Sequence, residues 1–289
     1  MTLHQTMIVT WSILFLAPSS SWAQSIVAAV LPSSSSVQVG TSATGFASII
    51  NTGSVTAISC GISLVTAIPA TFTSQTTNPL TNQVTGNPNI PVNIPPGAAQ
   101  SFVFVLRPFS LILPTNVQFS FNCLNTIPAP LNTGLNTLLF SVSSILVPNI
   151  MALAATTSND GIVNISGTNG NGAFAVATVN VGASGNITAS ADTGSTTLPI
   201  NIALCQTNPA IGQCISTIGP AVATTINANA TPTFGIFVQG DGDVPFDPAT
   251  NRIFVRFKDV NGVTRGSTSV AVRTTTSTDI RGRMAMEPQ

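Results

Sequence analysis

Three residue types that often serve in acid–base catalysis, metal binding or ring stacking do not occur in this chain after residue 23. Its only histidine is His4, its two tryptophans are Trp11 and Trp22, and it contains no tyrosine. A nucleophilic serine or threonine needs a neighbouring base, and no Ser-x-x-Lys motif offers Lys258 for that role. The sequence therefore predicts a protein that is not an enzyme.

The densest acidic group lies in the segment GDGDVPFDP, which contains Asp241, Asp243 and Asp247. Closely spaced carboxylates in a turn can chelate calcium, but the twelve-residue calcium-loop pattern is absent. An ordinary Asp-Gly turn without a cofactor is the favoured interpretation. The alternative is a calcium-dependent carbohydrate- or surface-binding protein that uses these three carboxylates.

Four basic residues form the second candidate site. Arg252, Arg256 and Lys258 occupy alternate positions of one expected strand, and Arg265 lies on the return strand. Such a face could bind an anionic polymer or a lipid headgroup. The favoured prediction is a solvated outer face whose cations pair with Asp259 and its acidic neighbours, and surface pairs of this kind contribute little stability.

Four cysteines in an exported chain predict two disulfides. Cys60 and Cys123 fall on the apolar faces of two alternating segments, so we expect them to meet in one core. Closing that loop stabilises the fold by about 4 kcal/mol in the chain-entropy account. Cys205 and Cys214 flank an Asn-Pro turn and form the second expected pair. Four free thiols are the alternative, and zinc would require all four cysteines to converge from distant regions.

The N-terminal segment predicts export. Residues 7–17 (MIVTWSILFLA) have the length of the apolar core of a secretion signal, and residues 21–23 (SWA) have the form of a cleavage site. The run is too short to span a bilayer, and nothing after residue 23 is long and apolar enough to do so. We expect residues 1–23 to be a signal peptide and the protein to be secreted to a periplasm, a cell surface or the medium.

Charge is sparse and unevenly placed after that segment. Only Arg107, Asp160 and Asp192 are charged before residue 241, and thirteen charged residues follow from Asp241 onward. The formal net charge is +0, which argues against nucleic acid as a partner because neutralising phosphates requires Lys and Arg. Uncharged polar side chains must therefore cover most of the surface.

The elements that must position these residues are short strands. Alternating or β-branched runs are separated by Gly, Pro, Asn and Asp, and no stretch shows a sustained helical period. The expected strands are 25–30, 43–51, 56–64, 101–106, 117–123, 136–146, 172–180, 186–191, 199–205, 233–238, 251–258 and 264–273.

A faint internal repeat predicts two domains. Asn51-Thr52-Gly53 follows an apolar strand, as does Asn180-Val181-Gly182 in the second half, and two later pairs of Phe-containing segments (101–105 with 233–238, 116–121 with 251–257) keep the same order. We expect two antiparallel β-sandwiches of about seven strands each. Their expected bounds are residues 24–148 and 149–275, with a polar tail at 276–289.

The run VGTSATGFASIINTGSVTAISCGISL, with its Asn-Thr-Gly turn, resembles the tandem immunoglobulin-like repeats of bacterial secreted and surface proteins. The resemblance implies a module for spacing, adhesion or assembly, with no catalytic residue. We expect it to contact a protein partner or a second copy, at a cell surface or in a matrix, through loops and strand edges. Edges with few charges are poorly protected against such pairing.

Overall fold

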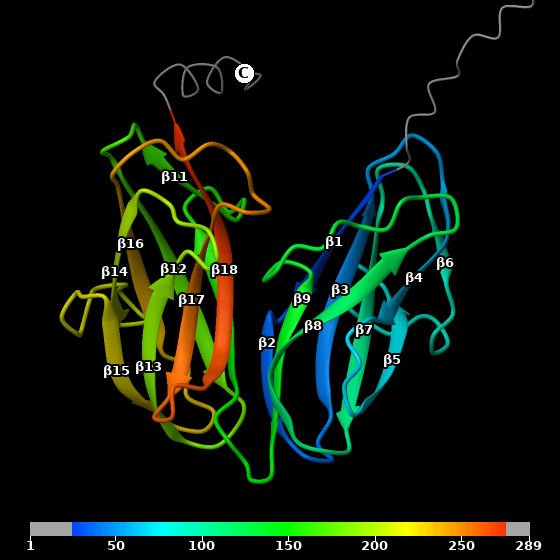
Figure 1. Ribbon diagram of the computed structural model, residues 1–289, viewed down its shortest axis with the longest axis horizontal. Helices are drawn as coiled ribbons and strands as arrows, with labels where there is room; N and C mark the ends of the chain where they lie inside the picture. Colours follow the sequence, from blue (N-terminus) through cyan, green and yellow to red (C-terminus); the bar gives the residue numbers. More distant parts are fainter. Residues whose placement is uncertain (1–24, 276–289) are drawn as a thin grey trace, which may run out of the picture.

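The computed structural model describes residues 25–275, so the expected signal peptide and polar tail lie outside the described residues. Within that range the chain forms β-strands and no helix. The strands build two β-sandwiches that lie side by side (Figure 1). The expected all-β fold class is confirmed.

The first sandwich contains nine strands in two sheets. Their orders are β1-β3-β7-β5 and β2-β9-β8-β4-β6. The strands are β1 (Ile26–Leu31), β2 (Ser34–Gln38), β3 (Ala43–Asn51), β4 (Ala57–Leu64), β5 (Ala70–Thr77), β6 (Val92–Ile94), β7 (Ala99–Pro108), β8 (Ile112–Asn122) and β9 (Thr137–Ser143).

The second sandwich repeats this topology strand by strand. Its sheets have the orders β10-β12-β16-β14 and β11-β18-β17-β13-β15. Each strand number is nine higher than that of the strand in the same position of the first sandwich. The strands are β10 (Ile150–Thr156), β11 (Ile162–Ser166), β12 (Asn171–Asn180), β13 (Gly185–Asp192), β14 (Ile200–Thr207), β15 (Ala221–Ile226), β16 (Thr233–Gly240), β17 (Arg252–Asp259) and β18 (Thr264–Thr275).

Each sandwich has the seven strands of an immunoglobulin constant-type arrangement and two more at its edges, β2 and β6 in the first sandwich. The expected count of seven is therefore too low. The β2 segment is a run of serines without apolar alternation, and β6 is only three residues long. The sheets are also not purely antiparallel, because β2 pairs parallel to β9 and β11 pairs parallel to β18.

Each sandwich buries its own hydrophobic core. The first core includes Phe102, Phe104 and Phe140, and the second includes Phe234 and Phe257, all of them buried. Every large side chain buried in this way stabilises the fold by about 1.5–3 kcal/mol. The expected domain boundary at 148/149 falls in the connection between β9 and β10.

A buried asparagine holds the repeated Asn-x-Gly turn in both sandwiches. Asn51 Nδ2 donates to the carbonyls of Val55 (2.8 Å) and Ile94 (2.9 Å). At the equivalent turn Asn180 Nδ2 donates to the Ala183 carbonyl (2.7 Å). Both asparagines are fully buried, so their side chains satisfy main-chain groups that water does not reach.

Both expected cysteine pairs are bonded in the structure. The Cys60–Cys123 bond joins β4 to the residue after β8, which are neighbours in one sheet, so it lies along a sheet and does not cross the core. The Cys205–Cys214 bond ties β14 to the segment that folds back along it. Disulfides such as these are typical of proteins that fold outside a reducing cytosol.

Candidate functional site

The most distinctive polar structure is the junction between the two sandwiches, where β2 lies against β18 (Figure 1). Ser33 Oγ donates to the Ser267 carbonyl (2.7 Å), and the Ser267 amide donates to Ser34 Oγ (2.6 Å). Farther along, Ser269 Oγ donates to the Gly134 carbonyl (3.0 Å). Short hydroxyl side chains let the two strands approach closely while their polar groups stay paired.

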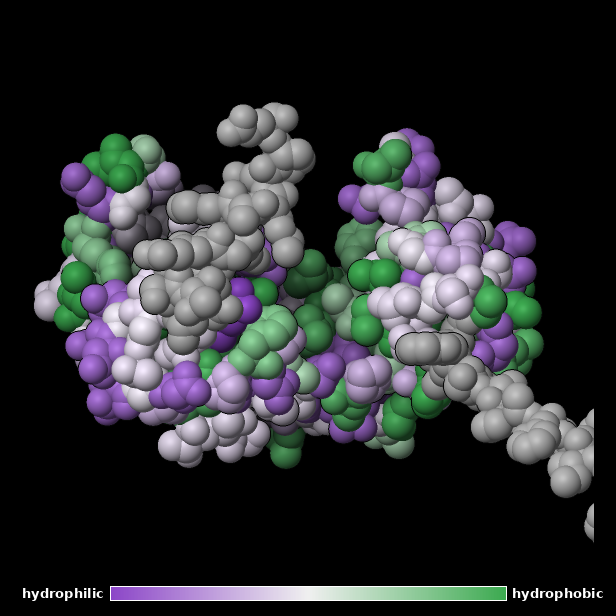
Figure 2. Space-filling view, turned by 90° about the horizontal axis from the view of Figure 1, so that it is seen from above, coloured by the Kyte–Doolittle hydropathy of each residue, from purple (hydrophilic) through white to green (hydrophobic). Residues whose placement is uncertain are grey.

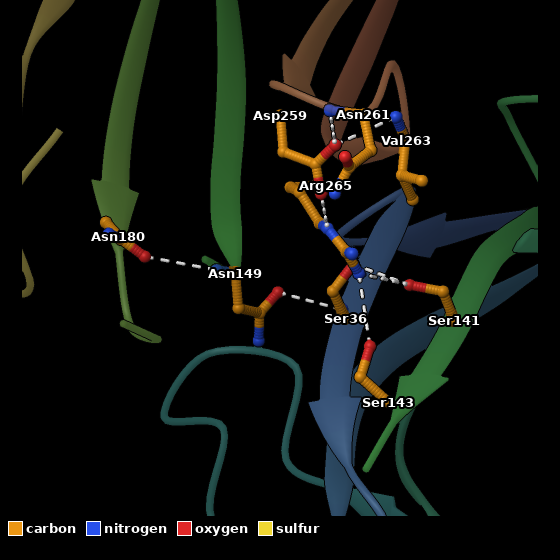
Figure 3. Close-up of polar contacts among 9 residues, drawn as sticks. All are labelled: Ser36, Ser141, Ser143, Asn149, Asn180, Asp259, Asn261, Val263 and Arg265. Carbon is orange, nitrogen blue, oxygen red and sulfur yellow. Dashed lines mark hydrogen bonds and ion pairs between the residues drawn. The ribbon is translucent and has the colours of Figure 1, made fainter. Parts of the chain in front are cut away.

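An arginine side chain crosses the junction (Figure 3). Arg265 belongs to β18 and is only 7% exposed. Its Nε lies 2.7 Å from Asp259 Oδ2, and its Nη1 reaches Ser141 Oγ (3.4 Å) and Ser143 Oγ (3.5 Å) of β9. The Arg265 guanidinium is thus buried between the sandwiches, and the side chain of its partner Asp259 is 11% exposed. Removing one partner of such a pair leaves a poorly solvated charge without its counter-ion.

The connection between the sandwiches is bonded to both of them (Figure 3). Asn149 Oδ1 accepts the Ser36 amide of β2 (3.0 Å), and the Asn149 amide donates to Asn180 Oδ1 of β12 (3.1 Å). The hydroxyls of Ser36 and Ser141 are 2.8 Å apart. A continuous hydrogen-bonded path therefore runs from the second sandwich through the connecting segment into the first.

A second arginine lies at one end of the junction. Arg252 is 6% exposed, and its guanidinium donates to the Pro248 carbonyl (2.7 Å) and to Ser269 Oγ. Burial lowers the pKa of this guanidinium below its ordinary value. Beside it, the Phe254 ring packs so closely on Gly134 of the first sandwich that a Cβ at that glycine would collide with the ring.

The expected solvated basic face is therefore wrong for Arg252 and Arg265, which are buried. Strand alternation does bring these side chains to one side of the sheet, but the first sandwich covers much of that side. The expected pairing of Arg265 with Asp259 is present. Arg256 pairs with Asp192 (2.6 Å), and Lys258 is partly buried on the same strand. The face available to an anion is consequently small.

The Asp192 carboxyl is stabilised in its charged form. Burial by itself would raise its pKa, but the hydrogen bond and charge of Arg256 and the Gly194 amide outweigh burial, so the pKa lies below its ordinary value. The Arg256 guanidinium also stacks over the Phe254 ring at 4.9 Å. These groups line a polar hollow at the edge of the junction.

Two of the three candidate calcium ligands accept hydrogen bonds from threonine hydroxyls. Asp243 Oδ1 accepts a hydrogen bond from Thr274 Oγ1 (2.6 Å), and Asp247 Oδ2 accepts one from Thr250 Oγ1 (2.6 Å). The Thr250 hydroxyl holds the pKa of Asp247 below its ordinary value. Among residues 25–275 no three acidic, histidine or cysteine side chains come close enough to hold a metal ion. The arrangement does not support the calcium alternative.

A cleft of about 520 Å³ opens above the junction, between the loop after β8 and the loop after β16. Pro130 and Leu135 line one side, and Phe246 and Pro248 line the other. Figure 2 shows hydrophobic residues gathered in this hollow. The carboxylate that lines this cleft belongs to Asp160, and its Oδ1 accepts hydrogen bonds from the Ser158 hydroxyl (2.8 Å) and the Ile162 amide (3.0 Å). The described part of the chain contains no helix with the length and apolarity needed to cross a membrane.

No protein-family model and no curated protein matches the chain. Among solved structures it is similar to the secreted serine protease VesC from Vibrio cholerae (11% identity, TM-score 0.24, 74% of this chain and 46% of the protease). It is also similar to BcpA, the major pilin subunit of Bacillus cereus (11%, 0.31, 87% and 70%). A third match is the N-terminal domain of PorA (13%, 0.26, 44% and 98%). The chain thus spans less than half of the protease, and these values are too low to transfer an activity.

Proposed function

We propose that this chain is an exported, non-catalytic structural module that acts through its strand edges and end loops in assembly or adhesion. Its two sandwiches form one rigid unit that holds these contact surfaces at a fixed spacing. Its partner is a protein or a second copy of the chain, at a cell surface or in an extracellular matrix.

The observation that carries the proposal is the bonded junction. Flexibly linked domains move relative to each other unless the interface between them is substantial. Here the buried Arg265–Asp259 pair reaches Ser141 and Ser143 of the other sandwich. Asn149 is bonded on both sides as well. A rigid two-domain unit is what a spacer or an assembly subunit requires.

The chemistry of the junction supports the non-catalytic part of the proposal. Ser33 and Ser269 donate their hydroxyl protons to main-chain carbonyls, whereas a nucleophilic serine donates to a base. The histidine that could supply such a base occurs in this chain only at position 4, within the expected signal peptide. The junction serines therefore act as structural contacts.

Small-angle X-ray scattering of the monomeric exported chain tests the rigid unit. We expect the scattering curve to fit a single placement of the two sandwiches. Arg265→Ala should broaden the distribution of placements, because it leaves Asp259 buried without its cation. Arg273→Ala is the matched control, since Arg273 donates to Asn164 within its own sandwich (2.8 Å).

A wild-type curve that fits only a broad range of placements would overturn the proposal. Identical scattering curves for Arg265→Ala and Arg273→Ala would show that the Arg265 contact does not hold the two sandwiches together.

A further inference from the structure

Each of the four sheets formed by residues 25–275 has two edge strands. One edge is β1, β2, β10 or β11, and the opposite one is called the outer edge here. These outer edges are β5 and β6 in the first sandwich and β14 and β15 in the second. In Figure 1, β15 lies at the far side of its sandwich from the junction. A strand edge has unpaired N–H and C=O groups that can pair with another strand unless it is covered or blocked.

Two of the outer edges are covered by loops of the same chain. The loop after β5 folds back so that the Thr85 amide donates to the Thr76 carbonyl (2.9 Å). The loop after β14 does the same, with the Ile215 amide donating to the Gln206 carbonyl (2.8 Å). The C-terminal half of each strand is therefore closed to a partner.

The third outer edge is blocked by its sequence. Strand β6 has three residues and lies between Pro91 and Pro95, and proline cannot donate to a strand ladder. Its counterpart β15 has six residues, Ala221–Ile226, without a proline or a charge. It pairs with β13 along its whole length, and no other described segment pairs with its outer side. Among the outer edges of residues 25–275, β15 is therefore the long one left open.

We propose that β15 pairs antiparallel with β15 of a second copy, about a two-fold axis. This joins two five-stranded sheets into one continuous sheet. The inference rests on the proposed function, because it names the edge and the partner of that assembly. An antiparallel pair of identical strands has two-fold symmetry, so the same surface serves both copies and the contact closes as a dimer.

The side chains of β15 suit an identical partner. Those exposed on the outer face are Ala221, Ala223 and Thr225, which are small and uncharged. The nearest cation across the sheet is Lys258, two strands away through Thr188. Strand spacing places it about 10 Å from the edge, so two copies of Lys258 would be more than about 20 Å apart, beyond the Debye length of about 8 Å. Neither steric bulk nor charge repulsion opposes the pair.

A second copy fits this edge better than a charged peptide does. The strand offers no charge that could select such a peptide, and specificity between strands comes from complementary side chains and charges. Two copies always present matching length and matching small side chains.

Light scattering coupled to size-exclusion chromatography tests the pair on the exported chain. The concentrations should run from about 5 µM to about 500 µM, where weak interfaces dissociate and form. We expect a monomer–dimer equilibrium. The double variant Ala223→Lys, Thr225→Lys places like charges across the two-fold axis and should weaken dimerisation at least about tenfold.

Two further samples make the test specific. Asn201→Lys with Ala203→Lys adds the same charge to the neighbouring edge strand β14, and should leave dimerisation unchanged. The charge-reversed variant Ala223→Glu, Thr225→Glu should also be monomeric alone, but mixing it with the lysine variant at β15 should restore a dimer. Circular dichroism melting curves confirm that each variant is folded.

A wild-type chain that stays monomeric at every concentration overturns this inference, as does a β15 lysine variant that dimerises normally. Failure of the mixture to associate would also overturn it, because then β15 does not face β15. None of these results affects the scattering test of rigidity, which is made on the monomer, so the two proposals fail separately.

Discussion

At the scale of single residues, buried polar side chains determine how the loops and the two sandwiches are held. Asn51 and Asn180 occupy equivalent turns, and both donate to main-chain carbonyls. Asn180 also takes part in the junction, because its Oδ1 accepts the Asn149 amide.

The Asp192–Arg256 pair gives a pH-dependent prediction. The folded-state pKa of Asp192 lies below its ordinary value of 3.8, so the pair contributes stability above the unfolded pKa and loses it as pH falls through the folded pKa. Asp192→Asn should lower the free energy of unfolding by about 0.5–1 kcal/mol at neutral pH, as for a partly exposed pair.

Urea unfolding of the wild-type and Asp192→Asn proteins at several pH values measures this difference. It should shrink as the pH falls below 3.8. A difference of the same size at about pH 2 would show that the effect does not come from the charge.

At the scale of elements, the two sandwiches share one topology but differ at their strand edges. The segments TNPLTNQ and TNPAIGQ, at residues 77–83 and 207–213, form the same turn, and in both the asparagine amide donates to the glutamine carbonyl at 2.8 Å. In the second sandwich a disulfide closes this hairpin. In the first, Gln75 Nε2 donates to the Gly86 carbonyl (3.1 Å).

The two disulfides should differ in their effect on stability. Their sequence separations are 63 residues for Cys60–Cys123 and 9 residues for Cys205–Cys214. In the chain-entropy account the long loop contributes about 4 kcal/mol and the short one about 2–3 kcal/mol. Replacing both cysteines of a pair by serine should therefore cost more for the first pair, as measured by urea unfolding. A larger loss for the short loop would contradict the chain-entropy account.

At the scale of the whole molecule, the distribution of aromatic residues allows a simple check of processing. After residue 23 the chain contains no tryptophan and no tyrosine. Once the first 23 residues are removed, near-ultraviolet absorbance should come only from the disulfides and a weak phenylalanine band. An absorbance spectrum combined with intact mass measures this. A strong tryptophan band in the exported protein would show that the segment is retained.

Some features could be predicted from local pattern because they depend on neighbours in sequence. Alternation correctly placed strands at Ala43–Asn51 and Thr233–Gly240 to within a few residues. Alternation does not predict β2, because its serines lack an apolar period. The strand pairs with β9 through the main chain, and the Ser34 hydroxyl accepts the Ser267 amide of the other sandwich. The repeated Asn-Pro turn is present in the sequence, but alternation does not single it out because the two copies share few apolar residues.

The sequence by itself determined the all-β class, the two cysteine pairs and the scarcity of groups for acid–base chemistry. These follow from composition and from period-two alternation, which are local properties. Only the tertiary structure decided that Arg252 and Arg265 are buried and that β15 is the long outer edge left open within residues 25–275. Alternation shows which side chains share a face, but what covers that face depends on segments more than a hundred residues away, such as Ser141 beside Arg265.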